Sequence, residues 1–143
     1  MRLGRNGRRS STGSSVVVDA SALVDLLLNH DAAPAVRSAL RRATLYAPST
    51  LDGEVLSGIR SAWLRGTVPG DRAEVALDDL AAMPVERVPD RVLLREAWAL
   101  RHNVSAPDAL YVALARKLAC PLITLDRRLA AAPGLEITVV VPG

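Results

Sequence analysis

Phenylalanine is absent from this chain, and its other aromatic residues are two Trp and two Tyr. So few aromatic side chains argue against a base-stacking platform of the single-strand-binding type. The single cysteine, Cys120, excludes an internal disulfide, which fits a reducing compartment. No apolar run approaches the roughly 20 residues of a membrane span, because Asp19 and Asp25 interrupt the longest candidate. We therefore expect a cytoplasmic protein without a membrane segment.

Lysine is also scarce, and the positive charge is unevenly placed. Lys117 is the single lysine among 18 basic residues, and the first fifteen residues carry four arginines and no acid. We predict a basic, flexible leader over residues 1–14 and one domain over residues 15–143. Such a leader can help to hold a polyanion, although a leader without function or an upstream start codon is an equally open alternative. Arginine suits phosphate geometry, but the same bias is typical of a GC-rich genome.

Short apolar segments alternate with helical patterns along the domain. Alternation of this kind predicts an α/β fold, with a central parallel sheet flanked by helices. The predicted strands are almost wholly apolar, as expected where helices cover both faces of a sheet. The strands are expected at residues 16–18, 44–48, 84–89, 121–125 and 135–143. The helices are expected at residues 20–29, 31–42 with Asp31 as its cap, 49–65, 69–83, 90–102 and 105–119, followed by a short helical turn at 126–134.

Acidic residues directly follow the first and the fourth of these strands. Asp19 ends the first strand and Asp126 ends the fourth. Asp108 stands in the first turn of the helix before the fourth strand, and Glu54 in the first turns of the helix after the second. Open α/β sheets place their sites outside the carboxyl ends of the strands. All four carboxylates are therefore expected to meet at one edge of the sheet.

Each acid has a plain structural alternative when it is taken alone. Asp19 and Asp126 can cap the helices that follow them. Ser105 and Asp108 form the S-x-x-D spacing of a capping box, and Glu54 suits the dipole of its helix. Taken together, however, four converging carboxylates repel and need a counter-charge. Oxygen ligands select hard cations such as Mg²⁺ or Mn²⁺, and the chemistry that most often needs this arrangement is phosphodiester hydrolysis.

Three segments and the closing strand carry a family resemblance over about residues 15–142. The segments are VVVDASALVDLL, APSTLDGEVLSGIRSA and APDALYVALARKLACPLITLDRRLA. With them the chain resembles the PIN-domain ribonucleases, and most closely the VapC-type toxins. The resemblance implies a three-layer α/β/α fold and an Mg²⁺- or Mn²⁺-dependent endoribonuclease toxin of a type II toxin–antitoxin system. It also implies a structured RNA substrate such as tRNA or rRNA, a VapB-like antitoxin and a homodimer.

The family pattern assigns roles to particular residues. Asp19, Asp108 and Asp126 are expected to hold the metal, directly or through water. Glu54 is expected to orient a metal ligand or the attacking water, with Gly58 one turn later leaving room beside it. Two hydroxyl positions fall on Ser21 and Thr124, which are expected to support the pocket, although plain capping or strand-end roles are equally open for both. Weaker candidates for RNA phosphate contacts are Arg127, Arg128, Arg41, Arg42 and Arg60.

Several readings stay open. Tyr111 can edge the pocket or pack in the core, and Trp63 and Trp98 can serve a partner groove or the core. A catalytically silent PIN fold that acts only as an interaction module is the main alternative function. A metal-dependent phosphoryl-transfer domain fits less well, because a receiver domain would need a second acid at the first strand and a late lysine. A D-x-D phosphatase would need an acid where Ser21 stands.

Overall fold

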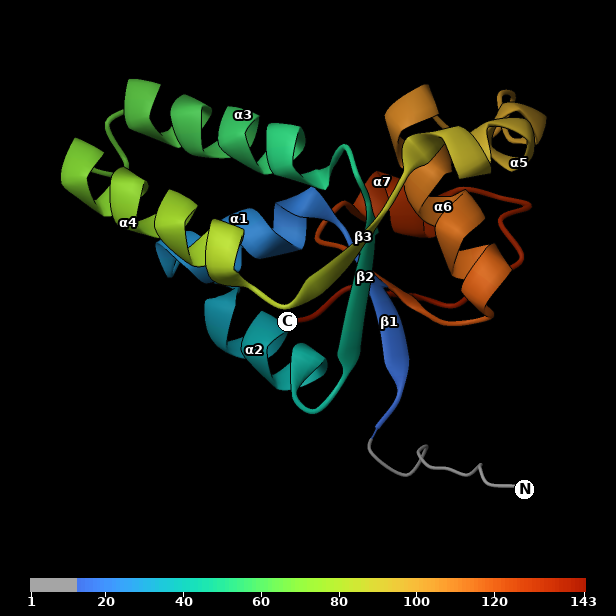
Figure 1. Ribbon diagram of the computed structural model, residues 1–143, viewed down its shortest axis with the longest axis horizontal. Helices are drawn as coiled ribbons and strands as arrows, with labels where there is room; N and C mark the ends of the chain where they lie inside the picture. The colour runs from blue at the N-terminus through green and yellow to red at the C-terminus, as the bar shows by residue number, and fades with distance from the viewer. Residues whose placement is uncertain (1–12) are drawn as a thin grey trace.

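A parallel sheet of five strands forms the centre of the computed structural model, which describes residues 13–143 (Figure 1). The strand order is β3-β2-β1-β4-β5. The order reverses direction between β1 and β4, which makes their carboxyl ends the switch point where α/β sheets carry sites. The strands are β1 (Ser15–Val18), β2 (Thr44–Pro48), β3 (Val85–Val88), β4 (Leu122–Ile123) and β5 (Val139–Val140).

Helices cover both faces of this sheet, which confirms the α/β/α prediction. In Figure 1 the first four helices lie on one side of the sheet and α5 and α6 on the other. The first layer comprises α1 (Ala20–Leu28), α2 (Ala33–Leu40), α3 (Leu51–Leu64) and α4 (Gly70–Ala82). The remaining helical segments are η2 (Asp90–Leu93), α5 (Leu94–Ala99), α6 (Ala106–Leu118) and α7 (Arg127–Ala131).

The central strand β1 is buried between these layers. Val17 and Val18 are fully buried, and burying an aliphatic side chain of this kind contributes about 1.5–3 kcal/mol. β1 pairs with β2 on one side and with β4 on the other. The backbone that leads into Asp19 is therefore held by two neighbouring strands and by both helical layers.

Two predicted boundaries were wrong. Asp31 does not cap α2, whose first residue is Ala33 and whose N-cap is Ala32 without a side-chain cap bond. Asp25 takes this role from the preceding helix, since its Oδ2 accepts from the Ala32 N–H at 3.2 Å. The helix expected over residues 90–102 is divided into the 3₁₀ segment η2 and the short helix α5.

The last two strands are shorter than predicted. β4 comprises two residues because side-chain hydroxyls take the backbone donors that follow it: Leu125 N–H donates to Ser21 and Asp126 N–H to Thr124. Glu136 has a φ of 58°, in the left-handed region, so the chain turns before β5. Most of the predicted leader lies outside the described residues, and its role stays a prediction. Within the described part, no helix is long and apolar enough to cross a membrane.

Candidate active site

Asp19 lies where β1 ends, and its carboxylate does not cap the helix that it precedes. It occupies the N-cap position of α1 but makes no side-chain cap bond there. Instead its Oδ2 accepts from the Ser21 hydroxyl at 2.9 Å and from the Thr124 hydroxyl at 2.6 Å. The residue is 7% exposed. The capping alternative for Asp19 is therefore wrong, and the structure presents it as a buried carboxylate held by two hydroxyls.

The two hydroxyls join the end of β1 to the end of β4. Thr124 is fully buried, and its Oγ1 accepts from the Asp126 N–H at 3.0 Å while its proton goes to Asp19. Ser21 Oγ likewise accepts from the Leu125 N–H at 3.0 Å. Each hydroxyl thus donates to the carboxylate and accepts from the backbone. Buried polar groups need partners of this kind, and here they fix the orientation of Asp19.

Asp126, in contrast, is a helix cap. Its Oδ1 accepts from the backbone N–H groups of Arg128 and Leu129, at 2.9 and 3.3 Å, in the first turn of α7. The capping alternative therefore holds for this residue. Capping does not remove the negative charge, since Asp126 still raises the pKa of Asp108. A cap and a charged wall of the site are compatible roles here.

Asp108 combines the two roles in a similar way. Ser105 is the N-cap of α6, and its hydroxyl accepts from the Asp108 N–H at 3.4 Å, as the capping box predicts. Burial raises the pKa of the Asp108 carboxyl above its ordinary value. A hydrogen bond with Ser105 opposes this rise, while the negative charges of Asp19 and Asp126 add to it. Asp108 is therefore close enough to both strand-end aspartates to feel their charges.

Glu54 faces the same group of charges from α3. Burial raises its pKa above the ordinary value, a hydrogen bond from Tyr111 opposes the rise, and the charges of Asp19, Asp108 and Asp90 add to it. The Tyr111 hydroxyl donates to Glu54 Oε1 at 2.6 Å. Charge interactions thus link Glu54 to Asp19 and Asp108, and Asp108 to Asp19 and Asp126, at the carboxyl edge of the sheet.

Sequence reasoning missed Asp90 beside Glu54 and left the role of Tyr111 open. Asp90 follows β3 after one proline, and its Oδ1 accepts from the Thr50 N–H at 3.3 Å just before α3. An acid at a strand end was the same signal that identified Asp19, so Asp90 was within reach of the sequence. Tyr111 both packs in the core, at 1% exposed, and reaches Glu54. Its two proposed roles were therefore not alternatives.

Gly58 has a different purpose from the one predicted. A Cβ at this position would lie 2.7 Å from Val24 Cγ2 on α1, which is too close for any real contact. The missing side chain thus allows α3 to approach α1, rather than leaving space beside Glu54. Close packing of these two helices sets where the first turns of α3 stand above the sheet.

The donor set fits a hard divalent cation, although the carboxylates are not drawn together around one point. Among residues 13–143, no three His, Cys, Asp or Glu side chains are grouped closely enough to hold a metal ion. Burial raises the pKa of Glu54 and Asp108, and the charges of neighbouring acids add to this rise, which a cation would relieve. Mg²⁺ usually keeps several waters and takes only one or two carboxylates directly. The carboxylate oxygens of Asp19, Asp108 and Asp126 are the type of ligand that would hold such an ion through bound water.

The arginines predicted to contact RNA lie in three places. Arg127 and Arg128 are exposed at the start of α7, and Arg128 lowers the pKa of Asp108, so this pair lies beside the acids. Arg60 is exposed on α3, six residues beyond Glu54, or about 9 Å along the helix. Arg41 and Arg42 precede β2 and lie at the amino edge of the sheet. The structure therefore does not bring them to the acids.

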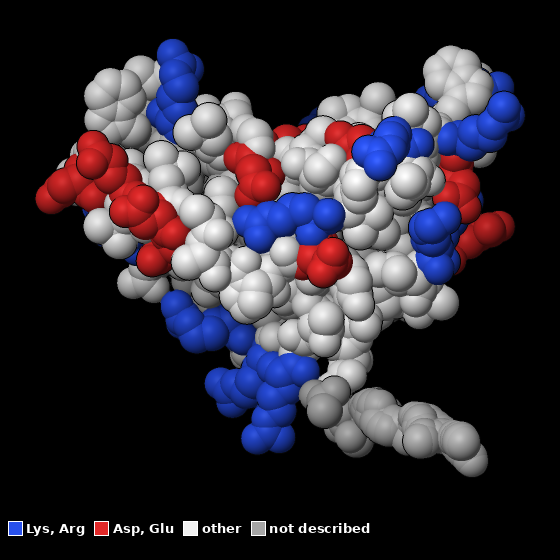
Figure 2. Space-filling model, viewed as in Figure 1, with Lys and Arg blue, Asp and Glu red and all other residues white. Residues whose placement is uncertain are grey.

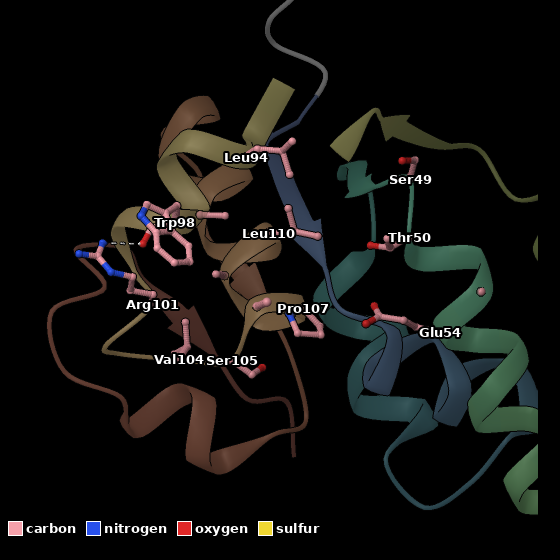
Figure 3. Close-up of a pocket in the computed structure, with 14 residues that line it drawn as sticks. Ser49, Thr50, Glu54, Leu94, Trp98, Arg101, Val104, Ser105, Pro107 and Leu110 are labelled. Carbon is pink, nitrogen blue, oxygen red and sulfur yellow. Dashed lines mark hydrogen bonds between the residues drawn. The ribbon is translucent and has the colours of Figure 1, made fainter. Parts of the chain in front are cut away.

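A groove of about 910 Å³ opens next to Glu54 (Figure 3). The start of α3 forms one wall and residues of α5 and α6 form the other, and Figure 3 shows Glu54 across from Pro107 and Leu110. Trp98 lines this groove and is 67% exposed. Trp63, on α3, is 52% exposed. The core alternative for both tryptophans is therefore wrong. Figure 2 shows a hollow between two lobes at the top of the molecule.

Comparison with known proteins finds one matching family model and several similar sequences. A model of the PIN domain family matches residues 16–135. The chain is 47% identical to Ribonuclease VapC1 of Mycobacterium tuberculosis over 121 residues, which cover 83% of this chain and 91% of that relative. It is 41% identical to Ribonuclease VapC3 of the same organism over 124 residues, covering 86% and 90%.

Solved structures share the fold at low sequence identity. The VapBC2 complex of Rickettsia felis, bound to a DNA fragment from its promoter, matches with a TM-score of 0.61 at 12% identity, over 88% of this chain and 97% of that one. A toxin–antitoxin complex from Klebsiella pneumoniae matches with a TM-score of 0.56 at 18% identity, over 90% and 98%. At these identities the likeness supports the arrangement of strands and helices alone.

Proposed function

The chain belongs to the PIN domain family, and on that premise we propose that it is a metal-dependent endoribonuclease, the toxin of a type II toxin–antitoxin system. The observation that carries the proposal is the buried Asp19: Ser21 and Thr124 hold its carboxylate, and its negative charge adds to the rise that burial causes in the pKa of Glu54 and Asp108. The relatives named ribonucleases support RNA as the substrate. Structured RNA such as tRNA or rRNA is the expected class, with cleavage in the cytoplasm.

The proposed metal is Mg²⁺ or Mn²⁺, held by Asp19, Asp108 and Asp126 directly or through water. When bound, such an ion offsets negative charge on the scissile phosphate and lowers the pKa of a coordinated water. Asp19 is the fixed member of this set because its orientation is held by two hydroxyls. Asp126 keeps one oxygen on the helix backbone, so its second oxygen is the one that can face the ion.

Glu54 is the group that we assign to the attacking water. Its pKa is raised by burial and by neighbouring acids, which brings a carboxylate closer to the pKa that a general base needs. The water oxygen bonds to phosphorus as the bond from phosphorus to the 3′ oxygen breaks. The attacking water gives its proton to Glu54, and the departing 3′ oxygen takes a proton from a solvent water. The products are a 5′-phosphate and a 3′-hydroxyl. Tyr111 positions Glu54 through its 2.6 Å hydrogen bond.

The proposed protein partner is a VapB-like antitoxin. The Rickettsia felis and Klebsiella pneumoniae structures are toxin–antitoxin complexes, which supports a partner of this class. The groove beside Glu54, with the exposed Trp98, is an apolar surface that such a partner can cover. The homodimer implied by the resemblance also stays a prediction, which sedimentation velocity would test.

The substitution Asp19→Asn tests the proposed function. It removes the charge and keeps an oxygen that the two hydroxyls can donate to, so the fold is expected to survive. We expect cleavage of bulk tRNA or rRNA in Mg²⁺ to fall by roughly 10³-fold or more. Mapping of new RNA 5′ ends with parent and variant would show this, with circular dichroism as the control for folding. Equal cleavage by both proteins would place the chemistry elsewhere, and no cleavage by the parent would favour the silent interaction module.

A further inference from the structure

The amino edge of the sheet carries positive charge that the proposed active site does not use. Arg41 and Arg42 stand in the turn between α2 and β2, and Arg37 stands one helical turn earlier on α2. All three are exposed. We call these three residues the arginine turn. In Figure 2 blue side chains gather at the lower end of the molecule.

The backbone of this turn is fixed. Thr44 N–H donates to the Ser14 carbonyl at 2.9 Å, which ties the start of β2 to the residue before β1. Gly13 lies against the Arg42 carbonyl so closely that a side chain there would collide with it. Arg42 itself has a φ of 64°, in the left-handed region where glycine or asparagine is favoured. Local backbone preference therefore does not account for an arginine at this position.

None of the three arginines is neutralised within the described part of the chain. The ion pairs there involve His30, Arg87 and Arg116 instead. Uncompensated guanidinium groups fit phosphate oxygens as two-pronged donors. The chemistry of this surface thus suits a polyanion.

The positions of the exposed apolar residues indicate whether this surface binds a membrane or a nucleic acid. A membrane-binding surface combines basic residues with apolar side chains that enter the lipid. The large exposed apolar side chains in the described residues lie on α3, α4, η2, α5 and β5, and none lies on α2 or in the turn. A nucleic acid backbone needs only charge and fits this surface better.

We propose that the arginine turn is a second RNA-binding surface, which holds the phosphate backbone of the substrate away from the cut. This inference rests on the proposed function. The residue before β1 and Asp19 are separated by about 17 Å of extended strand. One phosphate cannot span that distance, so the two edges engage different parts of a folded RNA. The arginine turn then favours structured substrates over short strands.

A binding measurement in the Asp19→Asn background tests this surface without depending on cleavage. The test variant combines Arg41→Gln with Arg42→Asn, since asparagine tolerates the left-handed backbone. The matched control combines Arg65→Gln with Arg95→Gln, which removes the same charge from exposed positions on α3's end and α5. The probes are fluorescent bulk tRNA, a DNA duplex of about 25 base pairs and vesicles of phosphatidylcholine and phosphatidylglycerol.

We expect the test variant to bind bulk tRNA roughly fivefold or more weakly than the parent, and the control to stay within about twofold. The slope of log affinity against log salt should become shallower by roughly 1.5 in the test variant only. Equal losses in the test and control variants would overturn the proposal, as would a larger loss for the duplex or the vesicles than for tRNA. If the arginine turn binds tRNA but the protein with Asp19 intact cuts no RNA, the proposed function is refuted and the binding surface is not.

Discussion

The ends of β1 and β4 read alike in the sequence but differ in the structure. Each is an apolar strand followed by an aspartate and then a helix. Asp126 caps its helix through backbone N–H groups, whereas Asp19 turns away from its helix and receives two hydroxyl groups. The difference arises because the β1 end has Ser21 and Thr124 as competing donors. The hydrogen-bond donors around a strand-end aspartate, not its position in the sequence, thus decide whether its carboxylate caps the following helix.

The largest expected effect comes from two substitutions of Asp126 that distinguish its role as a helix cap from the effect of its negative charge. Asp126→Ser keeps a good cap but removes the charge, while Asp126→Ala removes both. We expect RNA cleavage to fall about 100-fold or more in both variants. The free energy of unfolding should fall by about 1 kcal/mol in the alanine variant only. Initial cleavage rates and urea unfolding curves measure the two quantities. Full activity in the serine variant would reduce Asp126 to a helix cap.

A smaller loss of activity is expected when the Thr124 hydroxyl, which donates to Asp19 at the end of β1, is removed. Thr124→Val keeps the shape of the side chain but removes the 2.6 Å donor to Asp19 and the acceptor for Asp126 N–H. Loss of a residue that orients a metal ligand costs about 10- to 100-fold in activity or metal affinity. Calorimetry with Mn²⁺ and cleavage rates would measure both. The control Thr124→Ser keeps the hydroxyl and should stay near the parent, and a valine variant that matches it would show that Asp19 needs no such support.

The smallest expected effect is a pH dependence of stability that the carboxylates share. The folded protein raises the pKa of Glu54 and Asp108 above their ordinary values. The folded state therefore binds more protons than the unfolded state, and the free energy of unfolding falls as pH rises from these ordinary values through the raised ones. In EDTA, the melting temperature should rise on lowering the pH from neutrality toward that interval. Mg²⁺ should restore stability at neutral pH.

Two variants sharpen that pH measurement. Glu54→Gln removes one of the groups with a raised pKa and should flatten the rise in melting temperature. Asp78→Asn removes an exposed acid of α4 and should leave the rise unchanged. If the metal-free protein instead loses stability on acidification over this interval, or if both variants behave alike, neither the burial of these carboxylates nor the repulsion among them limits its stability.

The alternating pattern of strands and helices was enough to predict the layers, the parallel sheet and the edge where the acids meet. It was not enough to predict the hydrogen bonds at that edge. Whether Asp19 or Asp126 caps depends on the hydroxyls around it, and the Thr124 hydroxyl lies 105 positions from Asp19, which local spacing does not reveal. Asp90 was missed because it follows Pro89 and reads as an ordinary helix start. Gly58 was misread because its neighbour, Val24, belongs to a different helix.

The hydrogen bond from Thr124 to Asp19 joins residues 105 positions apart in the chain. Contacts of such long sequence separation form late in folding, because the intervening chain must be ordered before they can close. A chain that is still emerging from the ribosome has Asp19 long before it has Thr124 and Asp126. Partly synthesised or partly folded chains therefore lack the site, and a cell that makes this protein meets its activity only when the whole domain is complete.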